Sequence, residues 1–306
     1  MARQIGAIRA WAEYAALAPV WGALRALSLE SAVRIGAALG PVAMALDVRQ
    51  RPIAMRNLAI AFPEMDQADR VNILRDAYRN FGRMAAEWTH FLRLDRRFVE
   101  SHVAYDGRVN WNDAIARSDG RGILVLTGHF GNFELLSIAH SLYGNRIAIV
   151  HRPNRNPLID SAVNVRRARF GNLAVPRRGA GREVIRLLRD NWMVAVPLDL
   201  DARHGVFVDF FSLKAATSDA LARLATTTGA PVLPAFMVRE GASTRHRITI
   251  LPVIDVVRSR DRIESARENT QRFTSAIEQM IRLHPDHWNW IHRRWKTRPP
   301  GEKRFY

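Results

Sequence analysis

From about Val103 onward, short apolar runs alternate with stretches of helical pattern, and this alternation constrains the fold more than any other feature. The expected strands are Ile123–Leu126, Ile147–Val150, Leu173–Val175, Met193–Pro197, Val232–Val238 and Ile248–Leu251. The expected helices are Asn132–Leu142, Pro157–Phe170, Gly181–Asp190, Ser218–Thr228 and Ile263–Leu283. Strands that alternate with helices form a mostly parallel sheet with helices on both faces. The sequence therefore predicts an α/β protein, whose ligands would bind beyond the carboxyl ends of the strands.

The first third of the chain has a helical pattern instead. Apolar residues at three- and four-residue spacing predict one long helix over Gln67–Leu94, and Pro63 ends a shorter helix around Ile53–Phe62. No linker or low-complexity segment separates these helices from the alternating strands and helices. We therefore expect residues 47–306 to form a single α/β domain with an α-helical beginning.

Residues 1–46 are unusually apolar. Their two longest uncharged runs are Tyr14–Leu24 and Ile35–Leu46, and Arg25, Glu30 and Arg34 lie between them. Each run is shorter than the ~20 residues that a transmembrane helix needs, so we expect an amphipathic helical hairpin that contacts a membrane surface. The alternative is a hairpin that packs on the core of the domain.

The charge of the chain is strongly positive and is carried by arginine. The formal net charge is +17, and Lys214, Lys296 and Lys303 are the only lysines. Guanidinium groups bind phosphate and carboxylate in a bidentate manner, so an anionic partner is expected: phospholipid headgroups, a phosphorylated substrate, an acidic carrier protein or nucleic acid. A codon bias towards arginine is the alternative explanation. The chain has no cysteine, which excludes disulfides, thiolate metal sites and a thioester intermediate on the protein.

The stretch HFGNFE follows the first strand of the expected sheet and contains His129 and Glu134. A carboxylate that binds one imidazole nitrogen would leave the other nitrogen as a general base, so we expect Glu134 to orient His129. The N–H groups of Gly131 and Asn132, at a helix N-terminus, could stabilise an oxyanion. The alternative is that Glu134 caps the helix and His129 is a core residue.

Other catalytic motifs are missing from the sequence. It has no G-x-S-x-G, Walker, G-x-G-x-x-G or H-E-x-x-H pattern. Asp199 and Asp201 could bind a divalent cation, but such acid pairs are common at strand ends, and we predict no metal site. Arginines are dense after the second expected strand, and about half of them could simply form a solvated basic face: Arg152, Arg155, Arg166, Arg167, Arg169, Arg177, Arg178 and Arg182.

Several motifs together resemble one known family. GHFGNFE, HRPNRNPLID…RRARFG, VPLDLDARHGVFVDFF, LATTTGAPVLP and HPDHWNWIHRRWKTRP occur in the order found in the bacterial lipid A late acyltransferases, which transfer lauroyl or myristoyl groups. This family belongs to the lysophospholipid acyltransferase-like superfamily, so a glycerol-3-phosphate acyltransferase-like fold is implied. The resemblance extends from about Arg51 to Pro299.

The resemblance implies which residues act. Its H-x-x-x-x-D/E motif corresponds to His129 and Glu134, and it implies direct transfer of an acyl group from an acyl carrier protein or coenzyme A thioester, without a cofactor. Substrate-binding residues would be Arg152, Arg166 or Arg169, and the acid pair Asp199 and Asp201. Phe130, Phe207, Phe210 and Phe211 are the candidates for lining an acyl pocket, although core positions are the more common role of such aromatic residues.

The acceptor implied by the resemblance is a hydroxyl of an anionic glycolipid, a lipid A precursor. The enzyme would then be peripheral or monotopic at the cytoplasmic face of the bacterial inner membrane. A mannosylated phosphoinositide, a lysophospholipid or an amino-lipid remain alternative acceptors. A basic nucleic-acid-binding protein is a distant alternative, because it leaves the apolar N-terminal segment without a role, and we expect no nucleic-acid partner.

Overall fold

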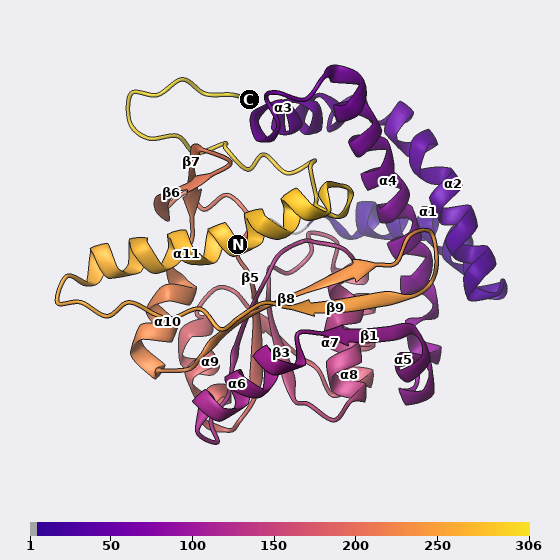
Figure 1. Cartoon of the computed structure of the whole chain (residues 1–306). Helices are drawn as coiled ribbons and strands as arrows, with labels where there is room; N and C mark the ends of the chain where they lie inside the picture. Colours follow the sequence, from indigo (N-terminus) through magenta and orange to yellow (C-terminus); the bar gives the residue numbers. More distant parts are fainter. Residues whose placement is uncertain (1–4) are drawn as a thin grey trace.

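A seven-stranded sheet forms the centre of the computed structural model, which describes residues 5–306 (Figure 1). Its strands run in the order β1-β9-β8-β2-β5-β3-β4. All neighbours are parallel except β8 and β9. The strands are β1 (Val103–Asp106), β2 (Leu124–Thr127), β3 (Ile147–His151), β4 (Leu173–Pro176), β5 (Met193–Pro197), β8 (Val232–Arg239) and β9 (His246–Ile250). This confirms the predicted mixed α/β fold with a mostly parallel sheet.

Helices cover both faces of this sheet, because successive side chains of a buried strand point to opposite faces. In β2, Leu124 and Leu126 belong to one apolar core, and Val125, with Ile123 directly before the strand, to the other. The first core includes side chains of α9 (Ala180–Arg189), α10 (Ala220–Thr228) and α11 (Arg262–Leu283). The second includes those of α5 (Arg96–His102), α6 (Arg108–Ser118) and α7 (Phe133–Leu142).

Some helices and strands are not apparent from the sequence pattern. Strand β1 is only four residues long, and α5 and α6 flank it. Strands β6 (Val206–Phe210) and β7 (Leu213–Thr217) form a separate antiparallel hairpin. Its turn residues Phe211 and Ser212 have φ of 52° and 59°. Glycine or asparagine usually occupies such positions, so the hairpin carried no recognisable turn signal.

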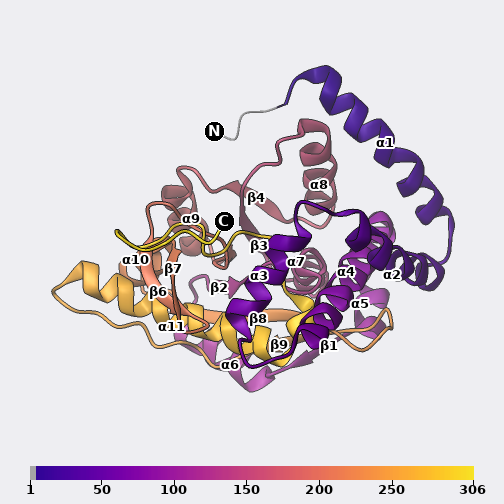
Figure 2. The same cartoon turned by 90° about the horizontal axis from the view of Figure 1, so that it is seen from above.

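Four helices form the N-terminal third: α1 (Ala7–Ala26), α2 (Leu29–Leu46), α3 (Arg51–Ala61) and α4 (Gln67–His90). Helix α2 packs along α4, whereas α1 lies against α4 and α8 (Pro157–Arg169), as Figure 2 shows. The two helices predicted within residues 1–46 are therefore present as α1 and α2, but each packs mainly against other helices and little against the other. Helix α2 is long and apolar enough to cross a membrane by length and composition, although it contains Glu30 and Arg34.

The long helix ends earlier than expected. The pattern over Gln67–Leu94 becomes helix α4 up to His90, followed by one 3₁₀ turn, η1 (Phe91–Arg93). A second short turn, η2 (Pro285–His287), begins the C-terminal segment that comes after α11. The carbonyl of its last residue, His287, accepts a hydrogen bond from the loop after β2.

Candidate active site

The loop Gly128–Asn132 joins the carboxyl end of β2 to the start of α7, and close packing fixes its shape. A Cβ atom on Gly128 would lie 3.2 Å from the Asp199 Cγ. Gly131 has a φ of +53°, and a Cβ there would lie 1.8 Å from the Met237 carbonyl oxygen. The loop thus needs glycine at Gly131 for both its backbone conformation and its space.

His129 is held by Asp199, which follows β5, the neighbour of β2 in the sheet. The His129 Nδ1–H donates to Asp199 Oδ1 at 2.9 Å, and the His129 backbone N–H donates to Oδ2 at 2.8 Å. Trp288 Nε1 donates to the same Oδ2 at 2.9 Å. Asp199 is only 1% exposed, whereas the His129 side chain is 28% exposed. The imidazole is therefore fixed through Nδ1, and no hydrogen bond engages Nε2 among residues 5–306.

The electrostatics of this pair favour a basic imidazole. Burial lowers the pKa of His129, but the charge of Asp199 and its hydrogen bond outweigh burial and leave the pKa raised. Burial would raise the pKa of Asp199, yet His129 and the other donors hold it well below its usual range. Asp199 therefore stays ionised beside the imidazole.

Glu134 does not make the hydrogen bond to His129 that the sequence analysis expected. Its carboxylate is bound by Arg167 of α8, at 3.0 Å from Nε and 2.5 Å from Nη2. The reason is geometric: Glu134 is in the first turn of α7 and faces α8, while Nδ1 of His129 faces the end of β5. Asp199, expected to bind substrate, occupies the orienting position, and Arg167 is a site residue that the prediction did not select.

Asn132 connects the loop to a buried charge network. Its Oδ1 accepts the Leu135 N–H at 3.1 Å and so caps α7, and its Nδ2 donates to Glu87 Oε2 at 2.7 Å. Arg239 binds both oxygens of Glu87 at 2.6 Å, and His246 Nε2 lies 2.9 Å from Oε1. This network ties the start of α7 to α4, β8 and β9.

The backbone N–H of Gly131 was expected to stabilise an oxyanion, but it is engaged in another hydrogen bond. Its N–H donates to the His287 carbonyl at 2.8 Å, and the same histidine accepts the Arg239 N–H at Nε2 at 3.0 Å. Gly131 therefore attaches the loop to the C-terminal segment. The N-terminus of α7 directly after it still directs its dipole towards the site.

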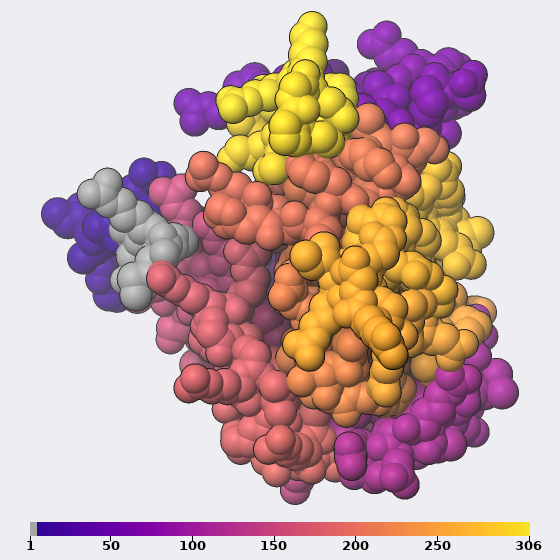
Figure 3. All heavy atoms as spheres, turned by 90° about the vertical axis from the view of Figure 1, so that its left-hand side faces the viewer, coloured from indigo at the N-terminus to yellow at the C-terminus, as the bar shows by residue number. Residues whose placement is uncertain are grey.

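A cavity of about 600 Å³ opens beside His129 at the carboxyl ends of the strands. Its lining combines Arg152, Arg167, Arg177 and Arg223 with a larger apolar surface made by Phe133, Val163, Val184, Ile185, Val196, Leu198, Leu221 and Leu224. We call it the arginine-lined cavity. Figure 3 shows the surface hollowed between the segment around residues 150–190 (pink) and the one around 200–230 (orange), whose residues line this cavity.

Several expected substrate-binding residues lie outside this cavity. The Arg166 guanidinium stacks 3.7 Å from the Trp88 ring centroid, and Arg169 Nε is 3.4 Å from the Leu92 carbonyl. Asp201 accepts the backbone N–H and hydroxyl of Thr297 at 2.9 and 3.0 Å. Among these candidates, only Arg152 has its predicted place in the cavity lining.

The expected acyl-pocket phenylalanines are also elsewhere. Phe130 is buried and packs against Phe236 and His287. Phe210 and Phe211 are buried among the C-terminal tryptophans, and Phe207 lies in the β6–β7 hairpin, outside the lining of the arginine-lined cavity. Phe130, Phe210 and Phe211 belong to the core, the alternative that the sequence left open, and Phe133 lines the cavity instead.

The C-terminal segment makes hydrogen bonds that hold the loop containing Asp199 and Asp201 in place. His292 Nε2 accepts the Asp201 N–H at 3.0 Å, and burial lowers the pKa of His292 to about 4, so the ring is neutral and can accept. Buried Arg294 donates to the Ala216 carbonyl at 2.8 Å and to the Thr217 hydroxyl at 2.5 Å. These contacts explain how a tail rich in tryptophan and arginine supports the loop after β5 and the β6–β7 hairpin.

The fold and the site together define an α/β protein with a histidine–aspartate pair beside an arginine-lined apolar cavity. The sequence profile described as bacterial lipid A biosynthesis acyltransferase matches residues 2–297, so the chain belongs to this family. This confirms the resemblance carried by the motifs.

Characterised relatives agree with this membership. The lipid A biosynthesis lauroyltransferase of Escherichia coli (strain K12) is 28% identical over 96% of this chain and 94% of its own. The myristoyltransferase of the same organism is 26% identical over 88% of this chain and 82% of its own. Its palmitoleoyltransferase is 28% identical over 89% of this chain and 87% of its own. Among solved structures, the 1-acyl-sn-glycerophosphate acyltransferase PlsC of Thermotoga maritima matches with 17% identity and a TM-score of 0.36, over 76% of this chain and 97% of that one.

Proposed function

We propose that this protein transfers a fatty acyl group from an acyl carrier protein or coenzyme A thioester to a hydroxyl of a lipid A precursor. One observation carries the proposal: buried Asp199 binds Nδ1 of His129, and the same histidine side chain borders the arginine-lined cavity. Membership of the lipid A acyltransferase family and the names of the relatives support this acceptor.

In the proposed mechanism, His129 Nε2 takes the proton of the acceptor hydroxyl as the oxygen attacks the thioester carbonyl. The N-terminus of α7 lowers the energy of the tetrahedral oxyanion. The carbon–sulfur bond then breaks, the ester forms, and the leaving thiolate takes the proton from the imidazolium. Asp199 orients the ring and stabilises its charged form. Glu134 acts indirectly, by holding Arg167 in the wall of the cavity.

The cavity suits such a donor chemically. Its apolar wall fits a fatty acyl chain, while Arg152, Arg177 and Arg223 can bind the phosphate group of a carrier arm. Large apolar side chains such as Ile8, Trp11 and Leu46 are exposed on α1 and α2. Together with the positive charge, they support a peripheral or monotopic place at the cytoplasmic face of the inner membrane.

The direct test supplies purified protein with acyl carrier protein loaded with a labelled acyl chain and a lipid A precursor, and follows the product by mass spectrometry. We expect one acyl addition, lost in His129→Ala. The matched control is His204→Ala, because His204 is an exposed histidine outside the cavity lining. A wild-type rate in His129→Ala would refute the role of His129, and acylation only of other lipid acceptors would refute the proposed substrate.

A further inference from the structure

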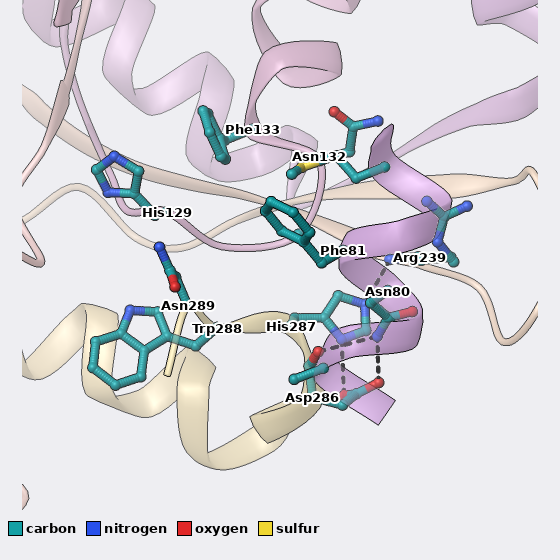
Figure 4. A pocket seen from close by; sticks show the side chains of 13 residues that line it. Asn80, Phe81, His129, Asn132, Phe133, Arg239, Asp286, His287, Trp288 and Asn289 are labelled. Carbon is teal, nitrogen blue, oxygen red and sulfur yellow. Dashed lines mark hydrogen bonds and ion pairs between the residues drawn. The ribbon is translucent and has the colours of Figure 1, made fainter. Parts of the chain in front are cut away.

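His129 also borders a second cavity, of about 120 Å³, on the side facing α4. Figure 4 shows His129 and Phe133 on one side of it, with Phe81 of α4 and Trp288 and Asn289 of the C-terminal segment around it. His129 and Phe133 are the only residues that line both this cavity and the arginine-lined one, within the described part of the chain. They therefore form the partition between two approaches to the imidazole.

The second cavity continues into an apolar groove of about 410 Å³. Ala77, Phe81, Trp288 and Asn289 line both. The groove lies between α1, α2, α4 and the C-terminal segment, and its lining is almost entirely apolar, including Leu17, Val20, Trp21, Leu24, Leu39, Ala43, Leu74 and Trp290. Its one charged lining residue among residues 5–306, Asp47, accepts the Tyr78 hydroxyl at 2.8 Å. We call this the α1–α2 groove.

The chemistry of the two approaches differs. Four arginines line the first, and no arginine or lysine of the described chain lines the α1–α2 groove. Arg239 lines the small cavity between the groove and His129, but Glu87 already binds its guanidinium. An anionic group would therefore bind in the arginine-lined cavity, whereas the groove offers only the burial of apolar surface. The rim of the groove is formed by apolar residues that are themselves exposed, such as Leu39 at 48%.

We propose that the α1–α2 groove binds a hydrocarbon chain of the acceptor lipid and so presents the acceptor's hydroxyl to His129 from the side opposite the donor. This inference rests on the proposed function. A lipid chain can enter the groove directly from a membrane in contact with α1 and α2, because the apolar rim is continuous with the exposed apolar residues of those helices. The donor, delivered from water by a carrier, uses the arginine-lined cavity.

Phe81 is the most informative of the four residues at the junction of the small cavity and the groove. It lines both the small cavity and the groove, and it is 58% exposed although it is large and apolar. A chain that runs from the groove to His129 would cover this ring and remove it from water. Phe81 is therefore a residue that contacts the acceptor chain in this proposal.

The first experiment fills the groove. Ala43→Trp adds an indole to the groove, and Val42→Trp is its matched control, because Val42 is exposed on the same helix but outside the lining. Initial rates are measured in detergent micelles with a full-length acceptor and with an acceptor of shortened chains. We expect Ala43→Trp to raise the KM for the full-length acceptor about tenfold, the effect of losing contact with roughly two methylenes. The donor KM and the preferred donor chain length stay unchanged, and the shortened acceptor is less affected.

The second experiment places a charge at the junction. Phe81→Lys should raise the acceptor KM in the same way, and Ile115→Lys, an exposed apolar position on α6 outside both cavities, should not. Both changes replace exposed side chains, so folding is expected to survive, and thermal melting checks it.

Two results would overturn the inference. A shift of the preferred donor chain length, with an unchanged acceptor KM, means that the groove holds the transferred chain. Unchanged kinetics in both Ala43→Trp and Phe81→Lys mean that no chain occupies it. Neither result touches the proposed function, which fails only if the wild-type protein does not acylate the lipid A precursor.

Discussion

At the scale of single residues, the position of one carboxylate decides the chemistry of His129. Asp199 and Glu134 both follow strands of the sheet, but only Asp199 reaches Nδ1, at 2.9 Å. Asp199 is fully buried and receives two further hydrogen bonds, which hold it against the imidazole. Glu134 forms an ion pair with Arg167 instead.

Replacing Asp199 by asparagine should change the pH profile. The Asp199 charge raises the pKa of His129 against the effect of burial, so its removal lowers that pKa. Because the neutral imidazole of His129 is the base, the fall of kcat/KM on the acidic side of its pH profile (the acidic limb) should move to lower pH. The rate at neutral pH should fall about 10²–10⁴-fold, since the ring loses its orientation and the stabilisation of its charged form. Rate measurements across pH check this, and an unmoved limb would show that Asp199 does not act on His129.

Replacing Glu134 by glutamine should have a different signature. The charge of Glu134 raises the pKa of His129 less than Asp199 does, so the acidic limb should move less than in Asp199→Asn. Arg167 loses a bidentate partner, and the wall of the cavity loosens, so KM values should rise several-fold. Arg167→Lys should resemble Glu134→Gln, because lysine keeps the charge without the fork. If Glu134→Gln instead shifts the limb as much as Asp199→Asn, Glu134 is the orienting residue.

At the scale of elements, the start of α7 is built by contacts from four directions. Asp199 after β5, Glu87 of α4 and His287 of the C-terminal segment contact the loop directly, and Arg239 of β8 acts through its ion pair with Glu87. Each contact is made by a part of the chain far away in the sequence. The short loop after β2 therefore depends on the whole surrounding fold for its shape.

Gly131→Ala tests this dependence. The new Cβ would meet the Met237 carbonyl at 1.8 Å, and the residue would keep a φ of +53°. We expect a loss of roughly 2–4 kcal/mol in the free energy of unfolding, with activity reduced as well. Gly120→Ala is the control, because Gly120 also has a positive φ, +73°, but open space around it. It should cost only about 1 kcal/mol. Equal losses in urea denaturation would show that the loop can move away from Met237.

At the scale of the whole molecule, buried charge joins the helical third to the sheet. Glu87 of α4 is paired with Arg239 and His246, and all three side chains are buried. Burial would raise the pKa of Glu87, but His246 and Arg239 outweigh it and lower the pKa from 4.5 to about 2. The folded state therefore binds this proton less readily than the unfolded state.

The sign of the pH dependence of stability is set by this lowered pKa. Glu87 contributes stability above pH 4.5, and that contribution is lost as the pH falls from 4.5 towards about 2. Glu87→Gln should lower stability at pH 7, since it leaves Arg239 buried without its charged partner, and should make stability less dependent on pH in this window. Urea unfolding at several pH values measures both effects. Unchanged pH dependence in the variant would mean that Glu87 keeps an ordinary pKa.

The sequence alone determined most of the helices and strands and which reactive side chains are available. The apolar runs are regular enough to predict six of the sheet strands, and most clearly β2, β5 and β8, since a strand buried on both faces needs a continuous apolar run. The glycine loop with His129 could be placed at the end of such a strand for the same local reason. The arginine-rich stretch after β3 likewise indicated an anion-binding surface.

Only the tertiary structure decided which of the reactive side chains contact one another. The order β2-β5-β3 brings Asp199 to His129, and nothing in the local sequence specifies that order. The local sequence also does not specify that Arg167, on a separate helix, binds Glu134. Nor does it specify that phenylalanines such as Phe210 pack against the C-terminal tryptophans in the core. Local patterns follow from backbone periodicity, whereas the site follows from packing between distant segments, which no single segment encodes.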